Sequence, residues 1–479
     1  MKGNVKMTGV EKIILFALIL GTFMTSLDAT IVSIAIPTMS EEFGEAGEDT
    51  SNISWVLLIY TLMLTCFILL WSKLGTKVGY KKVFVTGIAL FTVTSLAIGL
   101  CGFIEELGLN AVIVLRAAQG LGAGMAMAMS LAMTTSYLPA AVRGSAIGSV
   151  TLAASAGTAF GPALGGILTT IHWSYIFFIN VPIGLLCVFL CLRYMHVEED
   201  LSKTKGLDYA GVLFMFVMMF ALIYYLNKGQ DIGWMSNEGM LLLAITFVAA
   251  GLLFWWEQRV KDPLMSMRLI RDGNILKANL ITMVMFMAMA GSYLLLPYYL
   301  GYVKGMETIE YGFVLIANSV GMMVSGPAVG KITDRTGDHK MFIIAGTLTA
   351  AFGFFLMMGF NPDTSLAYIL LALFIMGAGM GMALVSCTSL AYGFIRPEEN
   401  SQLSGQTATF RQAGSSIGVA TLNATFMANL AYGAVTVAAI LESGFKHAFF
   451  VAVVMALVGF AMAMSTRNAK DVQDDQNSA

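Results

Sequence analysis

Residues 13–38 read IILFALILGTFMTSLDATIVSIAIPT, and Asp28 is the only charged residue in this stretch. As an α-helix, a stretch of this length rises about 39 Å, which exceeds the hydrocarbon thickness of a bilayer, ~30 Å. Comparable apolar stretches recur along almost the whole chain. Only helices and closed barrels satisfy their backbone hydrogen bonds in lipid, and these stretches are too long and continuous for barrel strands. The sequence therefore predicts an all-α polytopic membrane protein.

The composition of the 479 residues agrees with a membrane protein: 57% are hydrophobic, 12% are charged, and the mean hydropathy is +0.78. A soluble globular chain has about 25% charged residues. The net charge of −2 gives no indication of nucleic-acid binding. The first apolar stretch is too long for a signal-peptide core, so we expect it to be the first span. We expect the five cysteines to be small core residues rather than metal ligands or disulfides: Cys66, Cys101, Cys187, Cys191 and Cys387.

The apolar stretches predict fourteen membrane spans. Their boundaries are 13–38, 53–72, 82–104, 108–138, 143–170, 174–195, 207–226, 239–257, 274–300, 309–330, 341–360, 366–395, 401–430 and 446–466. The stretch 428–446 is weakly apolar and is not assigned to a span.

Lysine and arginine are distributed very unevenly between the two sides of this arrangement. With the N-terminus in the cytoplasm, 22 of the 27 fall in cytoplasmic ends and loops and three fall outside. Arg116 and Arg411 lie within spans. Cytoplasmic loops of membrane proteins carry the excess of positive charge. The pattern predicts that both termini are cytoplasmic, in the cell (plasma or inner) membrane.

An internal repeat divides the chain. Three segment pairs recur at offsets of 258, 255 and 257 residues: Ser72–Lys82 with Gly330–Lys340, Gly122–Ala128 with Gly377–Ala383, and Ala156–Ala163 with Ala413–Ala420. The repeat unit is about six spans, which leaves two spans between the copies. Parallel six-helix halves are a known transporter plan, with the substrate site between the halves. We predict an N-terminal half (1–200), two linker helices (201–272), a C-terminal half (273–466) and a cytoplasmic tail (467–479).

Few ionisable residues lie within the spans, where they are costly and usually functional. Asp28 lies roughly 13 Å from the outer end of its span, and Arg116 lies one or two turns from the outer end of its own, so the two side chains are able to approach each other. Arg411 lies near the middle of the thirteenth span. Glu257 and Asp208 lie at cytoplasmic span ends, where snorkelling or helix capping explains them.

Asp28 has the chemistry of a coupling group. Burial favours the protonated form of a carboxyl, and a nearby arginine favours the ionised form. A carboxyl whose surroundings change during transport therefore takes a proton on one side of the membrane and releases it on the other. A cationic substrate would compete for the same carboxylate. The alternative is a static bridge between Asp28 and Arg116 that only stabilises the fold.

Residues 157–166 read GTAFGPALGG within the fifth span. Pro162 removes a backbone hydrogen bond, and Gly157, Gly161, Gly165 and Gly166 allow close helix contact around it. The motif predicts either a conformational element or simply a tight helix crossing.

At these residues the sequence resembles the major facilitator superfamily, and within it the fourteen-helix drug:proton antiporter branch (EmrB/QacA type). The resemblance rests on LDATIVSIAIP at 27–37, LRAAQGLGAG at 115–124, the glycine motif at 157–166, WSYIFFINVPIG at 173–184 and RQAG at 411–414. It covers nearly the whole chain. It implies the major-facilitator fold, with the helices arranged as 6 + 2 + 6, and a transporter rather than an enzyme.

The resemblance also implies roles for individual residues. Asp28 and Arg116 would form the proton or cation site, and the glycine motif would shape the conformational switch. The loop between spans 2 and 3 would contribute Lys73, Lys77, Gly79, Lys81 and Lys82, and its repeat would contribute Gly330, Asp334, Arg335 and Gly337. Candidate cavity residues are Thr30, Gln119, Asn318 and Arg411.

Two departures from the family pattern concern these motifs. The 2–3 loop normally has Gly first and Asp fifth, where this chain has Ser72 and Thr76. The loop therefore lacks one of the charged side chains that usually stabilise the outward-open state in the family. Asp334 in the second copy is a candidate to replace it. Gly301 and Asn318 stand where Gln and Pro are expected. Asn318, in lipid, should find a polar partner.

The expected function is proton-coupled export of hydrophobic small molecules, cationic ones included, with the proton gradient as the driving force and no cofactor or metal. The expected partners are the substrate, protons and the lipid bilayer, with a monomer favoured. A dedicated exporter of one native metabolite is the main alternative. A nutrient symporter or uniporter is disfavoured by the motif at 157–166. A membrane enzyme is disfavoured because the four histidines form no metal or nucleophile constellation: His172, His196, His339 and His447.

Overall fold

The structure is a computed structural model that describes residues 7–43, 52–104, 108–138, 143–195, 208–260, 263, 267–395, 400–430 and 437–467. Within these ranges the chain is helical, without a β-strand. The first nine helices are α1 (Gly9–Glu42), α2 (Trp55–Val78), α3 (Tyr80–Cys101), α4 (Leu109–Tyr137), α5 (Arg143–Thr169), α6 (Tyr175–Phe178), α7 (Asn180–Tyr194), α8 (Tyr209–Ile232) and α9 (Asn237–Glu257). The others are α10 (Met267–Arg271), α11 (Gly273–Tyr298), the π-helical turn η2 (Tyr299–Val303), α12 (Thr308–Thr336), α13 (His339–Met357), α14 (Leu366–Tyr392), α15 (Asn400–Ala428) and α16 (Val437–Met464).

Twelve helical segments of the described part are long and apolar enough to cross a membrane. They are α1 to α4, α6 with α7, α8, α9, α11 with η2, α12, α13, α14 and α16. The predicted number of fourteen is therefore not confirmed. The other two predicted spans form α5 and α15, helices of 27 and 29 residues that are rich in Gly, Ser and Thr. Both pack among other helices, where small side chains allow close contact.

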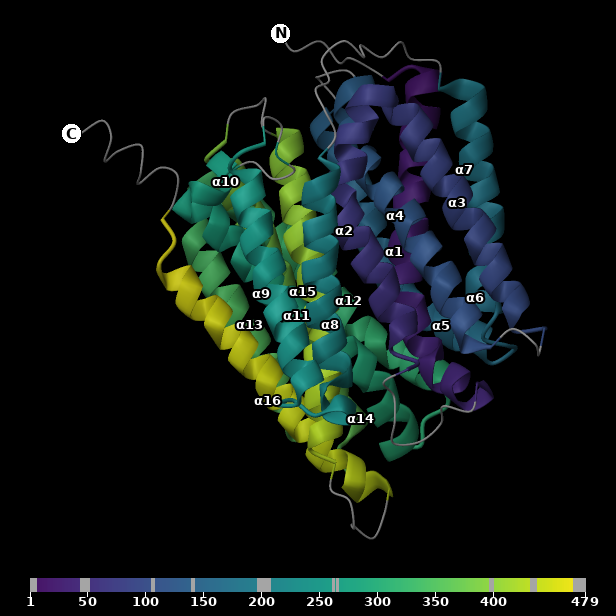
Figure 1. The fold of residues 1–479 in the computed structure, drawn as a ribbon, viewed down its shortest axis with the longest axis vertical. Helices are drawn as coiled ribbons and strands as arrows, with labels where there is room; N and C mark the ends of the chain where they lie inside the picture. Colours follow the sequence, from purple (N-terminus) through teal and green to yellow (C-terminus); the bar gives the residue numbers. More distant parts are fainter. Residues whose placement is uncertain are drawn as a thin grey trace.

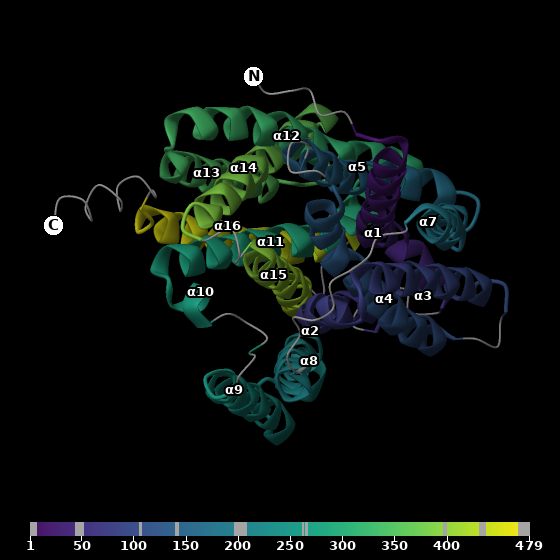
Figure 2. The same ribbon diagram turned by 90° about the horizontal axis from the view of Figure 1, so that it is seen from above.

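The helices run roughly along one axis, in two groups (Figure 1). Helices α1 to α7 form one group and α11 to α16 the other, and the two views place them on opposite sides of the molecule (Figures 1 and 2). The groups meet where α5 packs on α12 and where α2 packs on α15. Helix α8 packs on α2 and α15 and carries α9 on its outer side, as Figure 2 shows. We call the end of the bundle where α1 begins the upper end, and the end where α1 ends the lower end.

The same close helix crossing occurs in both groups. Between α3 and α4, a Cβ added to Gly87 would lie 2.8 Å from the carbonyl oxygen of Gly122. Between α13 and α14, a Cβ added to Gly379 would lie 2.6 Å from the carbonyl oxygen of Gly346. Small residues allow this approach, which maximises van der Waals contact where water supplies no hydrophobic drive. The crossings lie at corresponding positions of the sequence repeat.

Large apolar side chains are exposed on the outside of the bundle. Val114 on α4, Phe189 on α7 and Phe247 on α9 are 69%, 58% and 73% exposed. An exposed apolar belt of this extent is unfavourable in water and suited to lipid. The chain is therefore a multi-pass membrane protein.

The predicted sixth span is interrupted in the structure, where α6 ends at Phe178 and α7 begins at Asn180. Pro182 in the first turn of α7 has no N–H to donate to Phe178, so the ladder breaks there and restarts. Several boundaries also differ from the prediction: α1 extends to Glu42, α2 to Val78, α8 to Ile232 and α12 to Thr336, and α16 begins at Val437. The tail beyond residue 467 and the loop 196–207 lie outside the described residues.

Candidate functional site

Asp28 lies in the middle of α1 and is fully buried. Its carboxylate accepts three hydrogen bonds from side chains of other helices. Arg116 of α4 donates to Oδ2 at 2.7 Å, and Gln119 of α4 and Asn180 of α7 donate to Oδ1 at 3.2 and 3.1 Å. These donors stabilise the ionised carboxylate in a place that water does not reach.

Arg116 is also fully buried and is held from several sides. Its Nε donates to the carbonyl oxygen of Val56 in α2 at 3.0 Å, and its Nη1 donates to Gln119 Oε1 at 2.6 Å. The guanidinium lies 4.1 Å from the ring centroid of Tyr60. Such contacts offset the cost of removing an ion pair from water. The predicted approach of Asp28 and Arg116 is thus observed, as a direct ion pair.

Ser95 of α3 completes this network by accepting a hydrogen bond from Gln119 Nε2 at 2.7 Å. We refer to Asp28, Ser95, Arg116, Gln119 and Asn180 as the charge cluster. Its members come from α1, α3, α4 and α7, so it fastens four helices of one group together. A change of charge on Asp28 therefore alters the attachment of α1 to its neighbours.

The glycine motif lies directly against the helix that carries Asp28. A Cβ on Gly157 would lie 2.5 Å from the carbonyl oxygen of Phe23, and one on Gly161 would collide with the hydroxyl of Thr30. Gly165 faces Ile31 in the same way. Helix α1 therefore packs backbone to backbone on α5 on both sides of Asp28.

Pro162 explains a polar contact at this crossing. Proline has no N–H, so the carbonyl oxygen of Thr158, four residues earlier, loses its helical partner. The hydroxyl of Thr30 lies 3.4 Å from that oxygen across the α1–α5 interface, within reach to donate to it, and 3.2 Å from the Leu27 carbonyl oxygen of its own helix. A membrane helix tolerates proline where a neighbouring hydroxyl satisfies the freed carbonyl. This contact defines the position of Thr30, which is partly buried.

The other face of the motif meets the second helix group. A Cβ on Gly312 of α12 would lie 2.5 Å from the carbonyl oxygen of Pro162 and 3.2 Å from the Cα of Gly166. Helix α5 thus lies between α1, which carries the buried carboxylate, and α12 of the opposite group. It is placed to transmit a movement of one group to the other.

Further contacts join the two groups toward the lower end. The hydroxyl of Tyr311 in α12 donates to the carbonyl oxygen of Ile34 at 3.2 Å. The hydroxyl of Tyr302 in η2 donates to Glu41 Oε1 at 3.1 Å. The groups are therefore in contact where α1 ends.

Asn318 of α12 is fully buried, and its amide donates to the hydroxyl of Tyr293 in α11. The sequence suggested that this residue would find a polar partner, and the structure places Tyr293 there. Gly377 of α14 packs closely on the Asn318 backbone. The place of Asn318 in a substrate cavity stays a prediction.

Arg411 lies in α15, where its guanidinium is 5.7 Å from the ring centroid of Phe286 in α11. Its side chain is partly exposed, in contrast to the fully buried Arg116. The neighbouring Gln412 contacts Met127 of α4, with 4.0 Å between Nε2 and Sδ. This part of α15 therefore lies at the boundary between the two helix groups.

In each of the two loop motifs a glycine with positive φ ends a helix at the upper end. Gly79 between α2 and α3 has φ of 106°, and Gly337 at the end of α12 has φ of 72°. Only glycine adopts such angles readily, which explains its place in both copies. The Thr76 hydroxyl donates to Lys73 O at 2.8 Å within α2, a local bond in place of the family's carboxylate. Lys81 bonds the Met195 carbonyl oxygen at the end of α7.

Lys77 and Lys82 are exposed, and Gly330 lies near Val385 of α14. The side chains of Asp334 and Arg335 lie outside the described residues. The roles of both loop motifs stay predictions.

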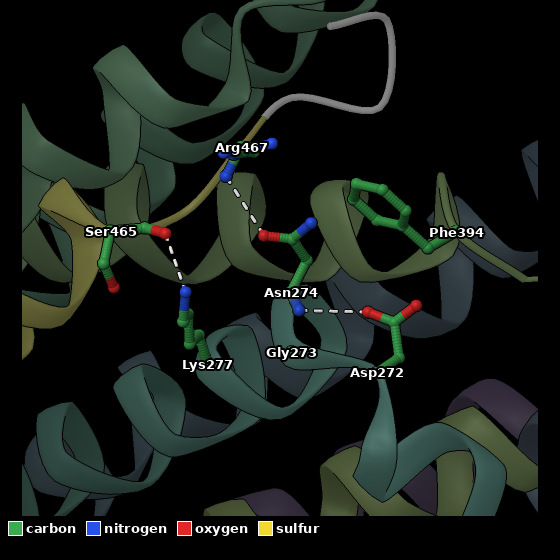
Figure 3. Close-up of a pocket in the computed structure, with 7 residues that line it drawn as sticks. All are labelled: Asp272, Gly273, Asn274, Lys277, Phe394, Ser465 and Arg467. Carbon is green, nitrogen blue, oxygen red and sulfur yellow. Dashed lines mark hydrogen bonds between the residues drawn. The ribbon is translucent and has the colours of Figure 1, made fainter. Parts of the chain in front are cut away.

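Two adjoining cavities of about 300 and 250 Å³ lie at the start of α11. Within the larger one, Lys277 Nζ donates to Ser465 O at 2.7 Å and the Arg467 amide to Asn274 Oδ1 at 3.0 Å, as Figure 3 shows. These bonds tie the beginning of α11 to the end of α16. The cavity is lined mostly by polar residues, lies at the helix ends and shares no residue with the charge cluster.

Comparison with known proteins agrees with this architecture. Residues 18–419 match the profile described as Major Facilitator Superfamily. The chain belongs to the Major Facilitator Superfamily. It is a transporter and not an enzyme.

Several curated members of the superfamily are similar to this chain. Multidrug resistance protein Stp of Mycobacterium tuberculosis is 33% identical over 425 residues, covering 88% of this chain and 77% of Stp. The tetracenomycin C resistance and export protein of Streptomyces glaucescens is 28% identical over 409 residues, covering 85% and 74%. Among solved structures, a D-xylose-proton symporter superposes with a TM-score of 0.66 at 16% identity over 96% of this chain and 98% of the symporter, which shows the fold alone.

Sequence reasoning missed part of the charge cluster of this superfamily member. Asn180 lies in the stretch 173–184 that carries the family resemblance, but the sequence does not indicate its bond to Asp28. It gives no indication of the roles of Ser95, Tyr60 and the Val56 carbonyl. The available signal was Asn180 itself, because an amide within an apolar span needs a polar partner.

Proposed function

We propose that this chain exports lipophilic small molecules in exchange for protons. The names of its relatives support export: Stp is a multidrug resistance protein, and the Streptomyces relative is a resistance and export protein. The single observation that carries proton coupling is the buried ion pair of Asp28 and Arg116 beside the glycine motif. Asp28 is also the only acidic residue deep within a predicted span.

The proposed coupling step is protonation of Asp28. A neutral carboxyl loses its Coulomb attraction to Arg116, which keeps its bonds to Gln119 and the Val56 carbonyl. The charge cluster then holds α1 less tightly. Because α5 packs between α1 and α12, a shift of α1 changes the contact between the two helix groups. Binding of substrate and of proton thus favour different arrangements, which is the requirement for exchange.

The orientation belongs to the same proposal. Both termini are in the cytoplasm, as the positive charges predict, so the lower end of the bundle faces outward. The contacts of Tyr302 with Glu41 and of Tyr311 with Ile34 then close the outer side, and this arrangement is the one that receives substrate from within. The protein works as a monomer in the plasma or inner membrane.

A dedicated exporter of one metabolite is the second candidate. The likeness to a tetracenomycin C exporter favours it, because that relative is named for one compound. An efflux screen of cells that express this chain separates the two candidates. Resistance to several unrelated lipophilic compounds supports the broad exporter, and resistance confined to one compound supports the dedicated one.

Proton coupling is tested in proteoliposomes with an imposed proton gradient. Asp28→Asn keeps the shape of the carboxyl but accepts no proton, so we expect gradient-driven substrate uptake and substrate-dependent proton movement to fall to background. Asp28→Glu retains the proton-accepting group and serves as the matched control, with partial activity. Normal transport and proton movement by Asp28→Asn would overturn the proposal.

A further inference from the structure

Arg411 is a cation in the membrane interior. It is the twelfth residue of α15, which places it about 17 Å from the start and 26 Å from the end of the helix, at ~1.5 Å per residue. Helix α15 is surrounded by α2, α4, α8, α11, α14 and α16, and Figure 2 shows it near the centre of the bundle. Arg411, whose side chain is partly exposed, therefore lies on a helix that other helices surround.

The chain supplies no acidic partner for Arg411. No Asp or Glu occurs within α2, α4, α11, α14 or α15. The other two neighbours, α8 and α16, carry acids only near their ends, at Asp231 and Glu442, and Asp208 caps the start of α8. Asp28 is deep in the bundle but is already bound by Arg116, Gln119 and Asn180.

The surroundings of Arg411 add donors rather than acceptors. One turn before it on the same face of α15, Thr407 donates to Asn279 Oδ1 of α11 at 2.8 Å. The Asn279 Nδ2 is buried and has no hydrogen-bond partner among the described residues. The seam between α11 and α15 thus carries an uncompensated guanidinium and an unused amide N–H. Phe286 provides an aromatic face beside the guanidinium.

Resting on the proposed export function, we propose that Arg411 binds the carboxylate of a lipophilic acid substrate. A guanidinium presents two parallel N–H groups that match a carboxylate, and an embedded cation is costly until an anion joins it. An apolar body of the substrate fits between helices lined by Phe286 and Met127. A cationic substrate finds no free acid here, because Asp28 is already neutralised by Arg116.

Binding is measured with the full-length protein in nanodiscs of phosphatidylcholine, without a pH gradient. The probes are 11-(dansylamino)undecanoic acid and its methyl ester, which share the apolar body and differ in the anion. For the wild type we expect the acid to bind at least about tenfold more tightly than the ester, the effect of one charge-assisted hydrogen bond. Equal binding of acid and ester by the wild type overturns the proposal without any variant.

The variants locate the anion site. Arg411→Gln should remove most of the preference for the acid, and Arg411→Lys should retain part of it. Arg193→Gln removes the same charge from an exposed position on α7 and should change nothing. An unchanged preference in Arg411→Gln refutes the assignment. If chloride displaced the bound probe as strongly as the acid does, Arg411 would be a site for inorganic anions, and this result would refute a substrate site.

The result is independent of proton coupling. No pH gradient is applied in the binding measurement. The preference for the acid over the ester is therefore tested in the same way even if the Asp28→Asn experiment fails. Conversely, a transporter that exchanges protons but binds acid and ester equally refutes only the role of Arg411.

Discussion

Helices α1 to α7 and helices α11 to α16 each carry an arginine within a long helix, but the two arginines have different neighbours. Arg116 lies 2.7 Å from Asp28 and is bonded to a backbone carbonyl and an amide as well. Arg411 has the ring of Phe286 at 5.7 Å and no acidic residue within its own helix or within α11. One side chain is fully buried and the other is partly exposed.

The difference shows how two copies of one helical repeat take different tasks. The glycine crossings of α3 with α4 and of α13 with α14 are shared, so the scaffold is the same. The charges are not shared. The pair of Arg116 and Asp28 joins helices of the first group, whereas Arg411 in the second group forms no ion pair among the described residues and is the cation that we propose binds a carboxylate. Comparison of the two arginines by mutation tests that division directly.

The largest difference is expected between the unfolding free energies of two variants, one that removes Arg116 and one that removes Arg411. Arg116→Leu leaves the Asp28 carboxylate buried without its cation, which costs about 3–5 kcal/mol in unfolding free energy. Arg411→Leu removes a charge that has no acidic partner and should leave stability unchanged or raised by about 1 kcal/mol. Unfolding in mixed micelles with increasing SDS measures both. Equal destabilisation by the two variants would show that Arg411 has a structural counterion after all.

The contact between the two groups at the glycine motif gives the next largest effect. In Gly312→Ala the new methyl group meets the Pro162 carbonyl at 2.5 Å, so α5 and α12 must separate. Overpacking of this kind costs about 1–3 kcal/mol, which corresponds to roughly a 5- to 150-fold shift toward the arrangement that is open at the lower end. Distances between spin labels across the lower end report the shift.

Gly301→Ala is the matched control for that variant. It lies in η2, and its added Cβ would approach Tyr311 no closer than 3.7 Å, an ordinary contact. The control should keep the wild-type distance distribution. A Gly312→Ala distribution that matches the control would mean that the α5–α12 crossing does not limit the movement of the two groups.

The sequence was sufficient to predict the long helices and the approach of Asp28 to Arg116, because both depend on local patterns. Asp28 and Arg116 stand out as charges in apolar stretches, and their depths along the spans agree. The contact of Pro162 with Gly312 could not be foreseen, since it depends on which helices of the two groups are adjacent. The same holds for Asn180, whose partner lies 152 residues away. The number of spans was also not settled, because α5 and α15, which the sequence predicts as spans, are not among the twelve segments found.

A smaller effect is expected where Thr30 compensates for Pro162. Thr30→Val keeps the shape of the side chain but leaves the carbonyl of Thr158 without its donor from α1. Hydrogen bonds between membrane helices contribute about 0.6 kcal/mol on average, and we expect a loss of that size in unfolding free energy. Thr349→Val, whose hydroxyl bonds only within its own helix at Ala345 O, is the control. A larger loss in the control would contradict an interhelical role for Thr30.

The smallest effect concerns the lower end, where the two groups are joined by Tyr302 and Glu41. Tyr302→Phe removes one exposed hydrogen bond to a carboxylate and should shift the equilibrium toward opening at that end by about 1 kcal/mol, roughly fivefold. Tyr298→Phe is the matched control, since its ring stacks on Tyr302 at 5.9 Å and its hydroxyl has no hydrogen-bond partner among the described residues. Labelling of a cysteine introduced at the lower end measures both variants. The bond joins α1 to η2, so faster labelling in Tyr302→Phe alone identifies this bond as a contact that closes the lower end. Equal labelling rates in the two variants would show that the α5–α12 crossing, and not this bond, keeps the lower end closed.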